Sequence, residues 1–139
     1  MGLRIYIAAP WIEKAQMSDI SARIENAGHQ ITYKWWDVED TPESDLTLPI
    51  LREQATNDVL GVRNADILVV LNTAKSEGKA LEQGIAIAGN KPIIIVGRRG
   101  EFSKNVFHYL DNYRWVVDVD SALAVLETCH WLISHEGVE

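Results

Sequence analysis

Short apolar runs alternate along this chain with segments in which apolar residues recur every three to four positions. The runs, rich in β-branched and aromatic residues, predict strands at residues 4–8, 30–36, 66–71, 92–96 and 115–119. The periodic segments predict helices at residues 13–27, 50–62, 79–89, 102–110 and 121–134, the last capped by Ser121. This alternation predicts an α/β fold: a flavodoxin-like, doubly wound, five-stranded parallel sheet in three α/β/α layers. The whole chain, residues 1–139, is expected to form a single domain.

In a doubly wound sheet, ligands bind outside the carboxyl ends of the strands. The predicted order therefore brings four segments to one rim, namely residues 8–11, 35–37, 72–78 and 97–103. The polar stretch at residues 37–48 is expected to be a long functional loop, and a second long loop is expected to follow residue 96.

Charge and cysteine content limit the classes of binding partner and the cellular compartments that suit this chain. The net charge is −7, and an acidic surface of this kind argues against a nucleic-acid polymer or an anionic membrane as partner. One cysteine, Cys129, excludes an internal disulfide and suits a reducing compartment. No apolar run approaches the roughly 18 residues of a membrane helix, and the first residues lead directly into a strand pattern. A cytoplasmic location is therefore expected.

The sequence motifs of several common catalytic and binding sites are absent. The sequence contains no GxGxxG after the first strand, no P-loop and no GxSxG elbow. The four histidines lack the spacing of a zinc site, so no metal and no cofactor are expected. Asn72 stands where a phosphoacceptor receiver domain would need an aspartate, and residues 8–11 (AAPW) cannot form the phosphate loop of an FMN flavodoxin.

Acidic and aromatic residues near the predicted rim are the remaining candidates. Glu82 lies near the start of a helix, where an anion is stabilised, but a solvent-facing role is equally compatible with its position. Pattern alone favours a solvated position for Asp58. Tyr6 lies in a buried strand, and its phenol needs a hydrogen-bond partner such as a carboxylate at the rim. Trp11, Trp35 and Trp36 could stack on a nucleobase or could pack as core or lid residues.

Three blocks of sequence carry a resemblance to a known family. They are residues 4–11 (RIYIAAPW), residues 57–58 through 64–71 (ND and NADILVVL), and residues 78–93 (GKALEQGIAIAGNKPI). Together they resemble the nucleoside 2-deoxyribosyltransferase family, which includes the 2′-deoxynucleoside 5′-phosphate N-hydrolases. The resemblance covers about residues 3–120 and implies cleavage of an N-glycosidic bond.

The resemblance also implies roles for individual residues. Glu82 matches the family nucleophile, Asp58 the acid on the sugar side, and Tyr6 the tyrosine that positions the nucleophile. Substrate contacts are implied for Ala9, Trp11, Trp36, Ser76, Gly78 and Asn105. Glu82, kept ionised by the helix start, would attack C1′ to form a covalent sugar ester, which a second base or water would then resolve.

Some positions depart from the family's pattern. Ser76 stands where deoxyribosyltransferases carry an aspartate, six residues before the nucleophile, and serine there is typical of the nucleotide N-hydrolases. Pro10 and Ile12, however, cannot supply the other phosphate contacts of those hydrolases. Glu77 or Asp37 could act as the general acid.

Several alternatives stay open at this point. The substrate could be a deoxynucleoside, its 5′-monophosphate, a ribonucleotide such as CMP, or NAD, and the acceptor could be a base or water. A non-catalytic nucleotide-binding module of the same fold is a further alternative. In the family, the region of residues 103–109 reaches the neighbouring subunit's site, so a homodimer or higher homo-oligomer with shared active sites is implied.

Overall fold

A computed structural model of the protein describes residues 2–38 and 43–136. Its strands are β1 (Arg4–Ala8), β2 (Gln30–Ile31), β3 (Ile67–Leu71), β4 (Ile93–Val96) and β5 (Tyr113–Val116). Its α-helices are α1 (Lys14–Asn26), α2 (Leu48–Asn64), α3 (Glu77–Ala88) and α4 (Val119–Glu136). Short 3₁₀ helices are η1 (Trp11–Glu13), η2 (Trp35–Asp37), η3 (Glu43–Asp45) and η4 (Val106–Tyr109).

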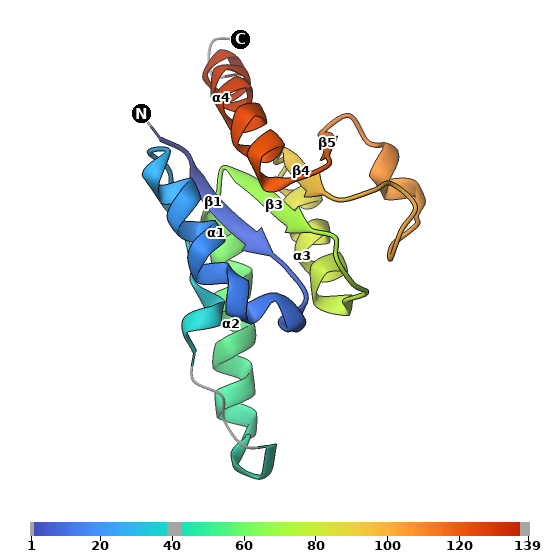
Figure 1. The fold of residues 1–139 in the computed structure, drawn as a ribbon. Helices are drawn as coiled ribbons and strands as arrows, with labels where there is room; N and C mark the ends of the chain where they lie inside the picture. Colours follow the sequence, from blue (N-terminus) through green and yellow to red (C-terminus); the bar gives the residue numbers. More distant parts are fainter. Residues whose placement is uncertain (1, 39–42, 137–139) are drawn as a thin grey trace.

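The five strands form one parallel sheet in the order β2-β1-β3-β4-β5. Helices α1 and α4 cover one face of this sheet, and α2 and α3 cover the other (Figure 1). The predicted three-layer, doubly wound α/β fold is therefore confirmed. Parallel strands require such crossovers, because a short hairpin cannot join their ends.

Alternate residues of the central strands β1, β3 and β4 enter two separate cores. Ile5 and Ile7 of β1 face α1 and α4, and they join a cluster that includes Met17 and Leu126. Tyr6 of β1 faces α2 and α3 with the other cluster. Because side chains alternate across a strand, this register sends the phenol of Tyr6 to the face that carries α2 and α3.

Several element boundaries differ from the sequence prediction. The strand expected at residues 30–36 has only two paired residues, because the chain leaves the sheet edge after Thr32 and turns into η2. Strand β5 begins at Tyr113, two residues before the predicted start. Asp118, and not Ser121, caps the last helix, since its Oδ1 accepts a hydrogen bond from the Ser121 backbone at 2.8 Å.

Two further predicted segments also differ in the structure. The helix expected at residues 102–110 is limited to η4. The predicted loop of residues 37–48 contains η3, and its residues 39–42 lie outside the described part of the chain. No helix of the described segments is long and apolar enough to cross a membrane.

Candidate functional site

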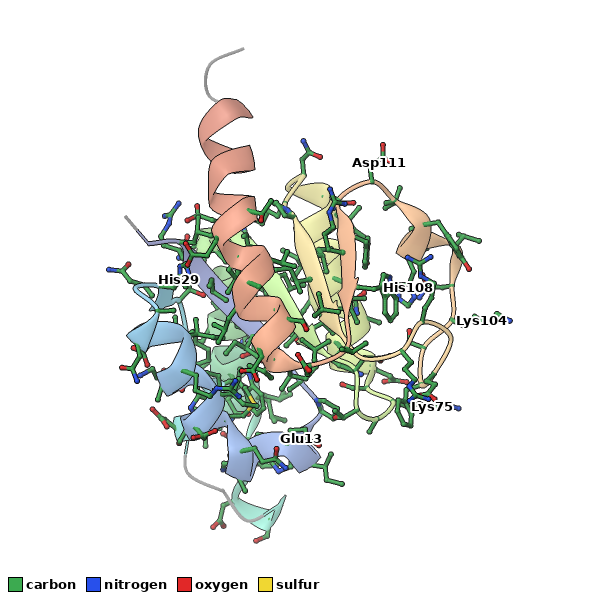
Figure 2. The ribbon with its side chains drawn as sticks, turned by 45° about the horizontal axis from the view of Figure 1, so that its top comes forward. Glu13, His29, Lys75, Lys104, His108 and Asp111 are labelled. Carbon is green, nitrogen blue, oxygen red and sulfur yellow. The ribbon has the colours of Figure 1, made fainter. Side chains whose placement is uncertain are left out.

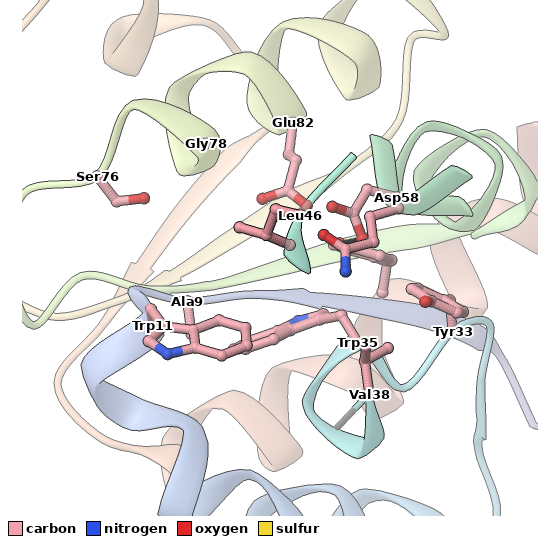
Figure 3. A pocket seen from close by; sticks show the side chains of 12 residues that line it. Ala9, Trp11, Tyr33, Trp35, Val38, Leu46, Asp58, Ser76, Gly78 and Glu82 are labelled. Carbon is pink, nitrogen blue, oxygen red and sulfur yellow. Dashed lines mark hydrogen bonds between the residues drawn. The ribbon is translucent and has the colours of Figure 1, made fainter. Parts of the chain in front are cut away.

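A pocket of about 540 Å³ opens at the carboxyl ends of β1 and β3, between the sheet, α2 and α3 (Figure 3). This is the rim that the strand order predicted. Its size lies within the usual range for small-molecule sites. The described residues that line it are Tyr6, Ala9, Trp11, Tyr33, Trp35, Val38, Leu46, Gln54, Asp58, Ser76, Gly78 and Glu82.

Tyr6 links the two carboxyl groups of this pocket. Its side chain is almost completely buried, and its hydroxyl donates to Asp58 Oδ1 at 3.3 Å. The hydroxyl is also within hydrogen-bonding reach of Glu82. Burial first, and then the negative charges of Glu82 and Asp58, raise the pKa of Tyr6. The phenol therefore keeps its proton, and its single O–H can donate to either of the two acids.

Glu82 projects from α3 into the pocket, on the side where Asp58 projects from α2 (Figure 3). It is the sixth residue of α3, whose first turn is capped by the Ser76 hydroxyl accepting from the Lys79 backbone at 3.3 Å. The pKa of Glu82 is raised to about 7: burial raises it most, the hydrogen bond from Tyr6 partly lowers it, and the charge of Asp58 raises it. The sequence expectation that the helix start favours the charged form is therefore outweighed by desolvation.

Asp58 is the second acid of the pocket, on the pocket-facing side of α2. Its pKa is raised by desolvation, and the hydrogen bond from Tyr6 partly offsets that rise. The negative charge of Asp58 in turn raises the pKa of Glu82, because like charges repel each other. The two acids can thus present their oxygens to the same ligand.

Tryptophan rings form the side of the pocket opposite the acids (Figure 3). Trp11 is 59% exposed, and its ring centroid lies 5.9 Å from that of Trp35. Trp35 is held by its Nε1, which donates to the Ile7 carbonyl at 2.8 Å. Trp36, expected at the rim, is only 5% exposed and packs in the core against α1, so it does not line the pocket. Trp35 takes the place at the pocket that the prediction gave to Trp36.

Asn105 lies in a different part of the molecule from the pocket of its own chain. Its Oδ1 accepts from the Phe107 backbone at 3.0 Å and caps η4, while its Nδ2 lies 3.4 Å from His108 Nε2. His108 is buried and turns inward toward β5 (Figure 2). Desolvation and the nearby Arg99 lower the pKa of His108. A substrate contact by Asn105 would therefore have to be made in the pocket of another copy.

Sequence reasoning missed four lining residues, Tyr33, Val38, Leu46 and Gln54. One of them carries a signal that could have found it: Gln54 precedes Asp58 by four positions in α2, so both side chains share one face. Val38 and Leu46 flank the segment that the structure leaves undescribed, and no periodic pattern marks them.

Buried polar contacts fix the loop that leads into α3. Lys79 is 3% exposed, and its Nζ donates to Asn72 Oδ1 at 3.2 Å and to the Ala74 carbonyl at 2.5 Å. Asn72 in turn donates to the Glu101 carbonyl at 2.8 Å. One turn further along α3, Gln83 donates to the Lys79 carbonyl and accepts from the Tyr113 hydroxyl at 2.9 Å. These contacts hold the rotation of α3 that turns Glu82 toward the pocket.

The charges of the pocket are all acidic. Its described lining includes two carboxyl groups and no lysine, arginine or histidine. Within the described residues, no three histidine, cysteine, aspartate or glutamate side chains are grouped to hold a metal ion. The arrangement can supply a partly buried carboxylate, a neighbouring hydrogen-bonding acid and aromatic surface for a planar ring.

Solved structures of similar fold include two with an assigned activity. A CMP N-glycosidase from Clostridium botulinum has a TM-score of 0.61 and 18% identity, with 90% of this chain and 98% of that chain covered. A 2-deoxyribosyltransferase from Bacillus psychrosaccharolyticus has a TM-score of 0.65 and 19% identity, covering 88% of this chain and 95% of that one. A conserved protein from Enterococcus faecalis has a TM-score of 0.66 and 14% identity, covering 92% and 99%. At these identities the similarity establishes the fold.

Membership of a family rests on the sequence itself. No curated protein matches the chain. The model of the family described as nucleoside 2-deoxyribosyltransferase, an enzyme family, matches residues 5–127 and so spans β1 to α4, including both acids of the pocket. This protein belongs to the nucleoside 2-deoxyribosyltransferase family.

Proposed function

We propose that the protein cleaves the N-glycosidic bond of a nucleoside, with Glu82 as the nucleophile. The observation that carries this proposal is the convergence of Glu82, Asp58 and the Tyr6 hydroxyl in one pocket lined by tryptophans. Tyr6 orients the carboxylate of Glu82, and Asp58 binds the sugar hydroxyls. Trp11 and Trp35 provide an aromatic surface for the base.

The chemistry proceeds in two balanced steps. A Glu82 oxygen bonds to C1′ of the sugar while the C1′–N bond breaks, and the base leaves with the electron pair and takes up a proton. A second base or a water molecule then bonds to C1′ and gives up a proton, and the ester bond breaks to restore the carboxylate. The sugar keeps its anomeric configuration, because each step inverts it once.

Charge favours an unphosphorylated substrate. A 5′-phosphate adds negative charge, and the described pocket lining holds two carboxyl groups and no cation to receive it. The overall net charge of −7 acts in the same direction. A nucleoside is therefore the preferred substrate.

A 5′-monophosphate is the second candidate, and one observation favours it. Ser76 and Gly78 line the pocket at the start of α3, where backbone N–H groups can bind a phosphate. Ribonucleotides such as CMP would use the same contacts.

Base release distinguishes these candidates. The protein is incubated separately with deoxynucleosides, ribonucleosides, their 5′-monophosphates and NAD, with and without a second free base, and the products are separated by chromatography. Release from nucleosides supports the proposal, and release from monophosphates alone supports the second candidate. A new nucleoside formed with the added base identifies transfer, whereas free sugar identifies hydrolysis. Intact-mass detection of a sugar adduct, lost in Glu82→Gln, tests the nucleophile, and base release that persists in Glu82→Gln contradicts it.

The active form is proposed to be a homodimer. Four apolar side chains on and beside η4 are 41–77% exposed: Val106, Phe107, Tyr109 and Leu110. Contact between copies through this segment would cover apolar surface. It would also bring Asn105 near a second copy.

A further inference from the structure

Gly61, in the interior of α2, lies directly against both tyrosines of the pocket. A Cβ at this position would lie 2.7 Å from Cδ2 and 2.8 Å from Cε2 of Tyr6, and 3.0 Å from the Cβ of Tyr33. Carbon atoms in ordinary contact are about 3.5–4.0 Å apart. Any residue other than glycine would therefore overlap the Tyr6 ring.

Backbone conformation does not explain this glycine. Gly28, Gly97 and Gly100 have positive φ angles, but Gly61 is an ordinary helical residue whose carbonyl accepts from Thr32 Oγ1 at 2.7 Å. Glycine destabilises a helix interior relative to alanine. The close approach of Tyr6 is the feature of the structure that accounts for its presence.

The Tyr6 ring has little freedom to yield. Tyr6 is 1% exposed and sits in β1, paired with Leu68 of the central strand β3. Asp58 precedes Gly61 by three residues, so both lie on the same side of α2. The hydrogen bond from Thr32 Oγ1 to the Gly61 carbonyl holds α2 in place here, so a side chain at position 61 must push the whole Tyr6 side chain away from α2. This displacement withdraws the hydroxyl from the acids, and its hydrogen bond to Asp58 is already 3.3 Å long.

We propose that Gly61 is a positioning residue: its missing side chain lets the Tyr6 ring lie against α2 so that the hydroxyl reaches both Asp58 and Glu82. The consequence for turnover rests on the proposed function. The consequence for the geometry and proton affinity of Glu82 does not.

Gly61→Ala tests this proposal, with Gly84→Ala as the matched control. Gly84 also lies inside a helix, α3, but a Cβ there meets nothing within 4 Å. The pKa of Glu82 is followed by the ¹³C chemical shift of its carboxyl group. Because the Tyr6 hydrogen bond lowers this pKa, Gly61→Ala should raise it above the wild-type value of about 7, and Gly84→Ala should leave it unchanged. If base release occurs, kcat/KM at pH 6 should fall about tenfold for each unit of that rise.

A double-mutant cycle with Tyr6→Phe separates positioning from general packing. Without the hydroxyl, Gly61→Ala should cause no further rise in the Glu82 pKa, although it should still lower the melting temperature. The proposal is overturned if folded Gly61→Ala keeps the wild-type Glu82 pKa or lowers it, since a fall would mean that α2 moves away with the charge of Asp58 while Tyr6 stays in place. It is also overturned if the same rise recurs in the Tyr6→Phe background. The Glu82 pKa and the melting temperature can be measured without turnover. A protein that releases no base would therefore contradict the proposed function, and this test of Gly61 could still be made.

A second pair of variants covers a failure of Gly61→Ala to fold. Removing the ring by Tyr6→Ala should make alanine tolerable at position 61. Relative to Tyr6→Ala, the double variant Tyr6→Ala/Gly61→Ala should lose far less thermal stability than Gly61→Ala loses relative to the wild type, because only the 3.0 Å contact with the Tyr33 Cβ remains. A double variant that loses as much, or that fails to fold as Gly61→Ala does, would overturn the explanation that the Tyr6 ring is the obstacle.

Discussion

At the scale of single residues, the proton affinity of Glu82 decides at which pH the proposed nucleophile is charged. Burial sets this affinity more than the position of Glu82 in its helix, because α3 presents the residue after its first turn and the pocket walls exclude water. The Tyr6 hydroxyl works against burial, since it stabilises the carboxylate by donating a hydrogen bond. Glu82 therefore titrates close to neutral pH.

The first prediction concerns the pH dependence of base release. The value of kcat/KM should rise about tenfold per pH unit below pH 7 and level off above it, since attack needs ionised Glu82 and its pKa is about 7. Asp58→Asn removes a charge that raises this pKa, so the acid limb should move to lower pH while kcat falls about 10²-fold or more. Steady-state rates from pH 5 to pH 9 check both statements. An acid limb that stays in place in Asp58→Asn would contradict the coupling between the two acids.

The second prediction links activity and stability at Glu82. The folded-state pKa, about 7, lies above the reference value of 4.5, so the folded state binds more protons between these values. The free energy of unfolding therefore falls as the pH rises from about 4.5 to about 7, because the carboxylate is charged in a desolvated site.

Glu82→Gln removes that charge. It should increase the free energy of unfolding at pH 8 by roughly 1–3 kcal/mol, and by much less at pH 4.5. Base release should fall at least about a thousandfold. Urea unfolding at the two pH values and a rate assay check these effects. Equal stability gains at both pH values would mean that packing, and not ionisation, causes the change.

At the scale of elements, the apolar pattern of the sequence predicted the central strands and the edge where a ligand binds. Strands β1, β3 and β4 are nearly continuous apolar runs, and their alternation with helices placed the binding edge at their carboxyl ends. The pairing of Glu82 with Asp58 and Tyr6 came from the resemblance, because no local pattern tells which helix faces meet across a sheet edge.

The segment around η2 shows why the side chains that face the pocket could not all be predicted from the sequence. Residues 30–36 alternate as an edge strand would, yet pairing stops after Thr32 and a 3₁₀ turn follows. The turn leaves Trp35 at the pocket and buries Trp36, although both were expected at the rim. The tertiary contact between Trp35 Nε1 and the Ile7 carbonyl distinguishes them. A shift of one residue in such an element moves a side chain from the pocket to the core.

The third prediction compares two tryptophans of similar chemistry. Trp36→Ala should lower the free energy of unfolding by about 3–5 kcal/mol, because it empties a buried core position. Trp11→Ala should change stability by less than about 1 kcal/mol, since 59% of that side chain is exposed, but it should raise KM. Urea unfolding and steady-state kinetics on both variants check the pair. A wild-type KM in Trp11→Ala would remove this ring from the substrate site.

At the scale of the whole molecule, the pocket and the exposed apolar segment around η4 lie in different parts of the chain. The pocket is built between α2, α3 and the ends of β1 and β3, whereas Asn105 and η4 follow β4. A role for Asn105 at a substrate site therefore depends on assembly. Oligomeric state and activity should change together if copies complete each other's sites.

The last prediction uses two valines with the same exposure. Val106 and Val117 are both 77% exposed, but only Val106 belongs to the apolar segment at η4. An aspartate in a dry interface leaves a charge without a partner, so Val106→Asp should weaken a dimer at least about a hundredfold and lower base release at protein concentrations where the wild type is dimeric. Val117→Asp should leave both properties near the wild-type values. Sedimentation velocity over a range of concentrations, run beside the rate assay, measures the two effects. A wild-type protein that stays monomeric would refute the dimer, and a dimeric Val106→Asp would place the interface elsewhere.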